Sequence, residues 1–145
     1  MNVDEILRNA SIEEKISLIA GFGFSKKVPG TAGETRAIER LNIPSLVLCD
    51  GPAGVRIPPF REGSSDTYFT TAFPNAIMLA SSWNLNIVEE VGKAIGEEAR
   101  DYGIDVMLAP GLNIERVLLG RNFEYFSEDP LLSGKMATAY VKGVQ

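Results

Sequence analysis

Two short segments concentrate the side chains that could do chemistry. In the first, CDGPAGVR (Cys49–Arg56), Asp50 ends an apolar run and precedes a Gly-Pro turn. A carboxylate held at such a turn can accept two hydrogen bonds from sugar hydroxyl groups, and Arg56 adds a planar guanidinium with five N–H donors. The same pattern is equally typical of a plain strand-to-loop turn in which the Asp50 side chain bonds nearby backbone.

The second segment is GRNFEYFSEDP (Gly120–Pro130), which holds one arginine, three carboxylates and three aromatic residues without a regular apolar period. Arg121 is a candidate donor to substrate oxygens, and Glu124 can orient it through a charge-assisted hydrogen bond. The aromatic residues are expected to anchor the loop by burial. The alternative is a structured surface loop that an Arg121–Glu124 pair holds together.

Several other kinds of site are excluded by residue type. The chain contains no histidine, so Ser-His-Asp catalysis, Cys-His catalysis and histidine zinc sites cannot be built from it alone. No phosphate-binding loop or calcium loop has the required spacing, and we expect no cofactor and no metal. The single Cys49 is expected in the core. Trp83 could stack on a sugar, but a core position is favoured.

Composition limits the partners. The chain has 145 residues, of which 45% are apolar and 23% charged, as in an ordinary soluble domain. A net charge of −5 with scattered basic residues argues against a nucleic-acid partner. The N-terminus has no apolar core of signal-peptide length, and no window approaches 18 apolar residues. We therefore expect no membrane association and a cytoplasmic location.

Helical patterns occupy three stretches. The first opens on the capping box Ser11-Ile-Glu-Glu14 and ends at Gly21, with isoleucines at helical spacing: Ile12, Ile16 and Ile19. The second opens at Asn84 and ends before Gly103. The third opens at Asp129–Pro130, with an N-cap and a proline at the first helical position.

Three apolar runs have the length of strands, and long loops (Gly51–Phe73 and Gly111–Asp129) follow two of them. The runs are Pro44–Asp50, Ala76–Ser81 and Ile104–Pro110. Strands alternating with helices predict βαβ units and a parallel α/β sheet. Function in such folds lies at the carboxyl ends of the strands, so the two chemical segments should meet on one face. Three units cannot close a (β/α)8 barrel of about 250 residues, which leaves an open sheet or the first part of something larger.

Three separated motifs then give the chain a resemblance to a known family. They are AGETRAIERLNIPSLVLCDGPAGVR, TTAFPNAIMLASSWN and APGLNIERVLLGRNFEYFSEDPLLSGKMATAYVKGVQ. Together they cover nearly the whole chain and resemble the N-terminal part of glycoside hydrolase family 3, of the β-glucosidase type.

The resemblance implies a (β/α)8 TIM-type barrel followed by an α/β sandwich domain, with residues 1–145 as the N-terminal portion and first three β/α units of the barrel. It implies retaining hydrolysis of terminal β-D-glucosyl residues. Asp50 would bind hydroxyl groups in the first sugar subsite, Arg56 and Arg121 would assist, and Glu124 would support Arg121.

By the same resemblance, the reactive carboxylates lie beyond Gln145. The nucleophile is an Asp on a later barrel strand, and the acid/base comes from the second domain. We therefore expect no catalytic residue in this chain and no hydrolysis by the isolated chain. Its partners would be a β-glucoside or related saccharide and the remainder of the enzyme.

This sequence departs from the family pattern in two loops. Glu115 stands in Asn113-Ile114-Glu115-Arg116 where the family commonly has His, and the stretch from there to Arg121 is one residue shorter. Arg36 also stands where a His is often found. Glu115 and the shortened stretch before Arg121 both lie beside the expected sugar-binding residues.

Two other functions remain open at this point. One is a non-catalytic α/β module that acts in self-association or sugar binding, because an open sheet exposes edges and an apolar face. The other is an unrelated α/β enzyme that uses Asp50 with Glu124 as its own acid/base pair. Preference among glucosides, xylosides and glucosaminides depends on residues outside the chain.

Overall fold

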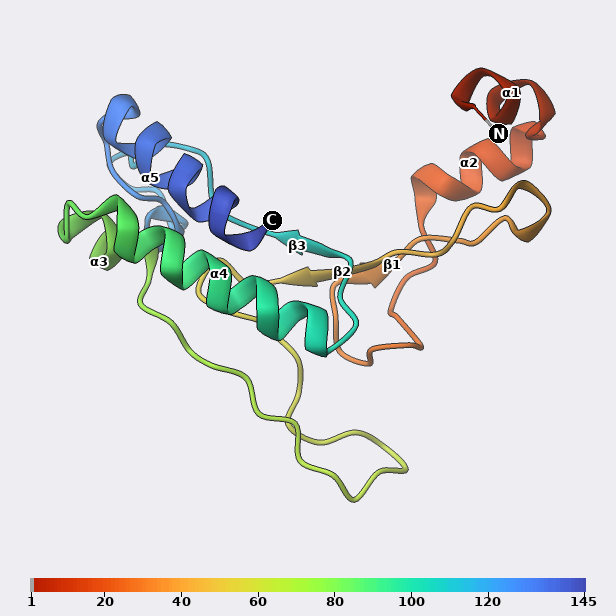
Figure 1. Ribbon diagram of the computed structural model, residues 1–145, viewed down its shortest axis with the longest axis horizontal. Coiled ribbons are helices and arrows are strands. Elements are labelled where there is room, and N and C mark those ends of the chain that lie inside the picture. Colours follow the sequence, from red (N-terminus) through yellow and green to blue (C-terminus); the bar gives the residue numbers. More distant parts are fainter. Residues whose placement is uncertain (1) are drawn as a thin grey trace.

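The computed structural model describes residues 2–145 and places a small sheet between two groups of helices (Figure 1). The long helices lie alongside the sheet, and two short N-terminal helices lie at the other end of the molecule. The elements in chain order are α1 (Val3–Asn9), α2 (Ile12–Ala20), β1 (Gly33–Glu34), η1 (Glu39–Leu41), β2 (Val47–Asp50), α3 (Ala76–Ser81), α4 (Leu85–Asp101), β3 (Val106–Leu108), η2 (Asn122–Glu124) and α5 (Pro130–Val144).

The sheet has the order β1-β2-β3, with β1 antiparallel and β3 parallel to β2. Val47 and Cys49 are fully buried in a core cluster, while Val106 and Leu108 on β3 stay partly exposed. The strands expected in Pro44–Asp50 and Ile104–Pro110 are therefore confirmed, although each is shorter than its apolar run. The two-residue strand β1 lies outside the three apolar runs.

The expectation of a strand over Ala76–Ser81 is wrong, because these residues form helix α3. The Asn75 side chain accepts a hydrogen bond from the backbone N–H of Met78 at 3.0 Å, which caps the helix at its start. Ala76, Leu79 and Ala80 are buried at helical spacing. A six-residue apolar run shows too little period to separate the two structures. The described residues thus hold two parallel strands where three were expected.

Helices α4 and α5 pack side by side, and they begin as expected. Asn84 caps α4, and Asp129 caps α5 with Pro130 in its first turn. Small residues let the two backbones approach closely. A Cβ atom at Gly92 would lie 2.4 Å from the carbonyl oxygen of Tyr140, and one at Gly143 would lie 2.0 Å from that of Glu89. The main core cluster lies at this contact and includes Val88, Ile95, Met136 and Tyr140.

The N-terminal helices are less well packed. The capping box of α2 is present, since Ser11 Oγ accepts from the Glu14 N–H and the Glu14 carboxylate accepts from the Ser11 N–H. Helix α1, capped by Asn2, was not expected from the sequence. Neither helix buries a residue, so the predicted helix α2 is confirmed while its isoleucine stripe stays exposed.

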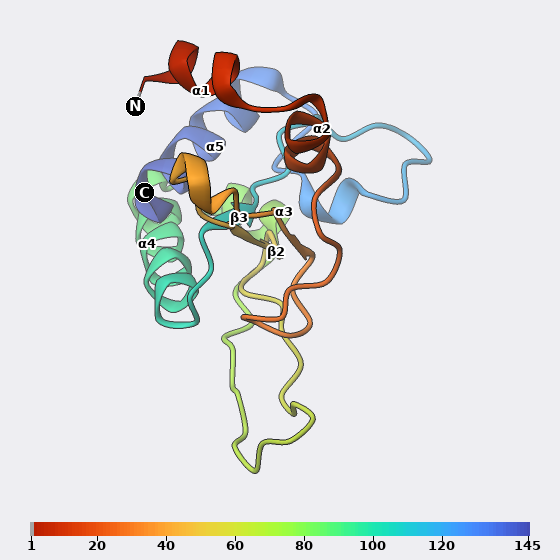
Figure 2. The same cartoon turned by 90° about the vertical axis from the view of Figure 1, so that its right-hand side faces the viewer.

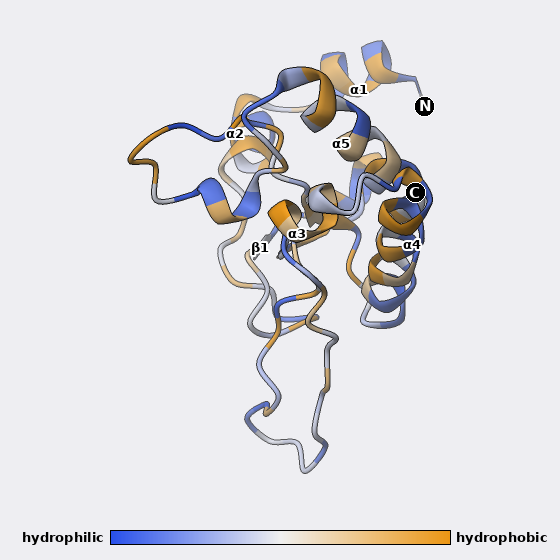
Figure 3. Ribbon diagram, turned by 90° about the vertical axis from the view of Figure 1, so that its left-hand side faces the viewer, coloured by the Kyte–Doolittle hydropathy of each residue, from blue (hydrophilic) through white to orange (hydrophobic). Residues whose placement is uncertain are grey.

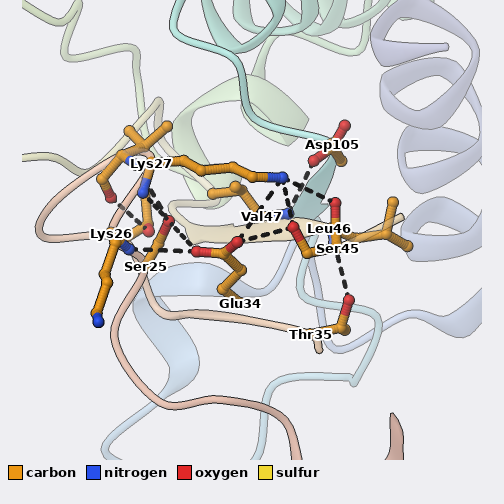
Figure 4. Close-up of polar contacts among 11 residues, drawn as sticks. Ser25, Lys26, Lys27, Glu34, Thr35, Ser45, Leu46, Val47 and Asp105 are labelled. Carbon is orange, nitrogen blue, oxygen red and sulfur yellow. Dashed lines mark hydrogen bonds and ion pairs between the residues drawn. The ribbon is translucent and has the colours of Figure 1, made fainter. Parts of the chain in front are cut away.

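Glu34 holds the start of the sheet together (Figure 4). Its carboxylate accepts hydrogen bonds from Ser45 Oγ at 2.8 Å, Ser25 Oγ at 2.9 Å and the Lys26 N–H at 3.2 Å. The Ser45 bond and then the Ser25 bond hold the pKa of Glu34 below its ordinary value. The side chain of Asp105 accepts from the Val47 N–H at 2.8 Å, which ties β2 to the segment before β3.

Two long loops project from this body (Figure 2). One connects β2 to α3 and the other connects β3 to η2, as the sequence predicted. The second loop includes Val117 and Leu118, which are almost fully exposed, and Figure 3 shows an apolar segment on the part of this loop that projects from the body. Both loops leave the carboxyl ends of the parallel strands, which is where α/β folds place their ligands.

Candidate functional site

Asp50 is the last residue of β2, and the turn after it has a backbone that only glycine allows. Gly51 has φ +139°, and a Cβ atom there would lie 1.6 Å from the carbonyl oxygen of Gly54. The Arg56 N–H donates to the Asp50 carbonyl at 3.1 Å and closes the turn. The turn therefore presents the exposed side chains of Asp50 and Arg56 from a fixed backbone.

The core supports this turn from beneath. Cys49 is buried, as expected, and burial raises the pKa of its thiol. The hydroxyl group of Tyr140 on α5 donates to the carbonyl oxygen of Pro52 at 3.3 Å. Burial raises the pKa of Tyr140 to about 12, so the phenol keeps its proton and remains a donor at neutral pH.

The second segment forms η2 and the residues around it. Arg121 Nε donates to Glu124 Oε1, and this bond is the main reason why the pKa of Arg121 lies above its ordinary value. The charge of Asp50 acts in the same direction. Glu124 is buried and Arg121 exposed, so a buried carboxylate orients an exposed guanidinium. This is the supporting contact predicted for Glu124.

The aromatic residues of the segment divide into two groups. Tyr125 and Phe126 are buried, and Phe126 packs edge-on against the ring of Tyr140 with centroids 6.5 Å apart. Phe123 is 58% exposed, so its expected role as a buried anchor is wrong.

Asn122 closes the loop before η2. Its side chain accepts from the Arg116 N–H at 3.0 Å and donates to the Arg116 carbonyl at 2.7 Å. These two bonds link Arg116 to Asn122 and so hold together the two ends of the shortened stretch noted in the sequence. The sequence places Asn122 beside Arg121 and Glu124 but predicted no role for it, because a lone amide in a loop carries no spacing signal.

All four predicted binding residues line one open pocket of about 570 Å³. They are Asp50, Arg56, Arg121 and Glu124, and the other polar and aromatic lining residues are Thr70, Thr71, Asn75 and Phe123. The volume lies within the usual range of small-molecule sites. Two segments about 70 positions apart in sequence thus meet at the carboxyl ends of β2 and β3.

The structure places two other candidates outside this pocket. Trp83 does not line it and is 77% exposed with φ +53°, so the expected core position is wrong. Arg36 stacks its guanidinium over the ring of Phe22, 5.1 Å from the centroid. Thr70, Thr71 and Asn75 belong to the second family motif, but they were missed as site residues because their types and spacing indicate no chemistry by themselves.

The residues that form the pocket also carry the match to a known family. Residues 34–145 match the model of the glycosyl hydrolase family 3 N-terminal domain. The chain belongs to glycosyl hydrolase family 3. Within this family it is 41% identical to thermostable β-glucosidase B of Acetivibrio thermocellus over 151 aligned residues, which cover 100% of the chain. Asp50, Arg56, Arg121 and Glu124 all lie inside the matched family region.

Solved structures of family 3 enzymes share the fold. The structure of β-glucosidase 3B from Thermotoga neapolitana in complex with glucose superposes with a TM-score of 0.92 and 56% identity over 99% of the chain. The exo-α-(1→6)-L-arabinopyranosidase of Bifidobacterium longum is 39% identical over 96% of the chain. The comparisons therefore show that the chain corresponds to the N-terminal region of family 3 enzymes and is similar to that region of β-glucosidases.

The chain spans about one fifth of the length of these relatives. It covers 19% of the A. thermocellus protein and 21% of the T. neapolitana protein. Among residues 2–145, no helix is long and apolar enough to cross a membrane. The same residues contain no group of three or more His, Cys, Asp or Glu side chains that could hold a metal ion.

Proposed function

We propose that this chain supplies part of the first sugar-binding subsite of a retaining family 3 β-glucosidase that hydrolyses terminal β-D-glucosyl residues. In this proposal the chain is a fragment or subunit that forms the first part of a (β/α)8 barrel. The observation that carries the proposal is the convergence of Asp50, Arg56 and Arg121 in one pocket. A relative with 56% identity is known in complex with glucose, which supports a hexose as the ligand.

Each group has a definite task. The Asp50 carboxylate accepts hydrogen bonds from two neighbouring hydroxyl groups, and Arg56 and Arg121 donate to sugar oxygens. Glu124 holds Arg121 in place through its Nε, which leaves the two terminal nitrogens of the guanidinium for the ligand. Phe123 offers an exposed ring at the pocket wall, against which the apolar face of a sugar can pack.

The pocket lacks a pair of free carboxylates. Retaining hydrolysis needs two carboxyl groups about 5–5.5 Å apart, one as nucleophile and one as acid/base. Asp50 and Glu124 are the two carboxylates that line the pocket, and Glu124 is bound to Arg121. A carboxylate that already accepts a hydrogen bond from a guanidinium is engaged in that pair and is not free to act on a substrate. We propose that both reactive groups come from other parts of the enzyme and that the isolated chain is inactive.

The rest of the barrel is the proposed partner of the sheet. Leu46, Val106 and Leu108 leave apolar surface partly exposed on the strands and beside them. A closed barrel would cover this face and remove the free edges of the sheet. Self-association of the chain is the second candidate function, and the same exposed apolar surface is the observation that favours it.

A binding experiment tests the proposal. Glucose is titrated into the 145-residue chain and into the protein made from the complete gene, with calorimetry as the measurement. Asp50→Asn should weaken glucose binding by about tenfold or more, since it removes a charged acceptor. The matched control Asp66→Asn changes an exposed loop carboxylate that does not line the pocket and should bind as the wild type does.

An activity assay and sizing separate the two candidates. With an aryl β-glucoside, the 145-residue chain should release no product by itself. Turnover by that chain, abolished in Asp50→Asn, would contradict the proposed division of the site. Light scattering that shows a stable oligomer without glucose binding would favour the self-association module. The cytoplasmic location stays a prediction, which cell fractionation with an antibody to the chain can test.

A further inference from the structure

Helix α4 holds the last part of the long loop between β2 and α3 at two points. The Glu98 carboxylate accepts from the Thr71 N–H at 2.9 Å and from Thr71 Oγ1 at 3.1 Å. One helical turn later, the Tyr102 hydroxyl group donates to the carbonyl oxygen of Phe69. Residues i and i+4 lie on the same face of a helix, so both contacts reach the same stretch of loop.

The held stretch packs directly against the turn that carries Asp50. The Phe73 N–H donates to the carbonyl oxygen of Ala53 at 2.9 Å. A Cβ atom at Gly54 would lie 2.3 Å from the carbonyl oxygen of Thr71, so the two backbones touch with no room for a side chain. Thr70 and Thr71 also line the pocket itself. The position of Thr71 therefore limits where the turn can lie.

We propose that Glu98 and Tyr102 are positioning residues for the sugar-binding pocket. They fix the segment 69–71 against helix α4, and this segment in turn fixes the Gly51–Gly54 turn that presents Asp50 and Arg56. The choice of glucose as the ligand rests on the proposed function. The contacts between helix α4 and the loop do not depend on that choice.

The loop needs such an anchor because it has little structure of its own. No helix or strand lies between Asp50 and Ala76 in the described residues, and most of this segment is exposed. A free loop of this length would sample many positions, and ordering it on binding would reduce affinity. Anchoring in the unliganded protein removes that cost in advance.

The neighbouring Glu97 provides a matched control on the same helix. Its carboxylate lies 3.9 Å from Lys93 Nζ, and its side chain is 55% exposed. Glu97 does not line the pocket, and the Thr71 N–H donates to Glu98 and not to Glu97. Replacing Glu97 changes the charge of α4 as much as replacing Glu98 does, without touching the loop.

The experiment uses the protein made from the complete gene, with variants Glu98→Ala, Glu98→Gln, Tyr102→Phe and the control Glu97→Ala. Hydrogen exchange at the Thr71 amide and the affinity for glucose are measured for each. Glu98→Ala should lose most protection at Thr71 and weaken glucose binding about tenfold, as expected when binding groups lose their fixed geometry. Glu98→Gln keeps an oxygen acceptor for the Thr71 N–H and should lie between wild type and Glu98→Ala.

The order of the two Glu98 variants separates positioning from helix stability. Alanine favours a helix more than glutamine does, so a role in α4 alone would make Glu98→Ala the milder change. A milder effect in Glu98→Ala than in Glu98→Gln, or unchanged hydrogen exchange at the Thr71 amide in Glu98→Ala, would overturn the inference. If the wild type binds no glucose, the proposed function fails, and exchange at Thr71 still decides whether Glu98 holds the loop.

Discussion

The helix pair α4–α5 and the helix pair α1–α2 have opposite environments, although α2 and α4 follow the same amphipathic pattern. In the first pair, Ile95 and Tyr140 are almost completely buried, at 0% and 1% exposure. In the second pair, Ile16 is 57% and Ile19 is 89% exposed. The pattern identifies a helix in both places, but it does not say what covers the apolar side.

The difference has a physical cause in the partner surfaces. Gly92 and Gly143 let α4 and α5 approach until side chains interlock, and the Phe126 ring fills the space beside Tyr140. Helices α1 and α2 each place one partly buried residue, Ile6 and Leu18, against a small apolar cluster that includes Leu41. Polar contacts with Arg40 add to this packing, since Arg40 pairs with Glu14 and donates to the Asn9 carbonyl at 3.0 Å. Exposed apolar stripes of this kind are typical of surfaces that another part of a protein covers.

The sharpest test of this contrast compares two isoleucines. Ile95→Ala should lower the free energy of unfolding by about 2–5 kcal/mol, because it leaves a cavity in the main core. Ile16→Ala should change it by no more than about 0.5 kcal/mol, because the side chain is largely in water already. Urea denaturation followed by circular dichroism measures both. Equal costs would show that α2 is as well packed as α4.

Alkaline pH should weaken the packed pair through Tyr140. Its pKa is raised to about 12 by burial, so the folded state keeps a proton that the unfolded state loses near pH 10. The free energy of unfolding should therefore be unaffected below pH 10 and fall by about 2–3 kcal/mol between pH 10 and pH 12. Tyr140→Phe should remove that part of the decline. A parallel decline in the variant would assign it to other groups.

Loss of a helix cap should act locally in one pair and globally in the other. Ser11→Ala and Asn84→Ala should each cost about 1 kcal/mol for the helix they cap. Because α2 is weakly packed, Ser11→Ala should speed hydrogen exchange within α2 alone. Asn84→Ala should speed exchange throughout α4 and α5. Uniform acceleration in both variants would mean that the two pairs unfold together.

The smallest effect is expected at the polar link between the N-terminal part and the sheet. The bond from Ser45 lowers the pKa of Glu34 from its ordinary value of 4.5. The carboxylate thus contributes stability that is fully present above pH 4.5 and is lost as pH falls through its lowered pKa. Glu34→Gln should flatten this acid dependence in urea titrations. Glu62→Gln, an exposed loop variant, should leave it unchanged.

Local signals in the sequence predicted local structure well. Capping residues placed the starts of α2, α4 and α5, since each cap satisfies backbone groups within one helical turn. The rule that function follows the carboxyl ends of parallel strands predicted that Asp50 and Arg121 would meet, and they line one pocket. Their roles toward a sugar remain predictions.

The failures arose where a segment is too short or too irregular to show a period, or where the decisive contact is distant in sequence. Ala76–Ser81 is equally apolar as strand or helix, and the Asn75 cap with burial on one face selects the helix. Phe123 precedes two buried aromatic residues in a segment without periodicity, so no local pattern showed that its side chain is exposed while theirs are buried. Thr71 lines the pocket and is bonded to Glu98, 27 positions away, and no local pattern records that contact.

The sequence by itself determined the starts of α2, α4 and α5, the positions of β2 and β3, the family resemblance and the four candidate binding residues. The helices and strands follow from capping and apolar patterns, which act over a few neighbouring positions, and the family follows from the resemblance of three motifs. Only the tertiary structure decided which apolar stripes are covered and how the long loop is anchored beside Asp50. Packing joins residues that are far apart in the chain, and no local pattern records which surfaces will meet.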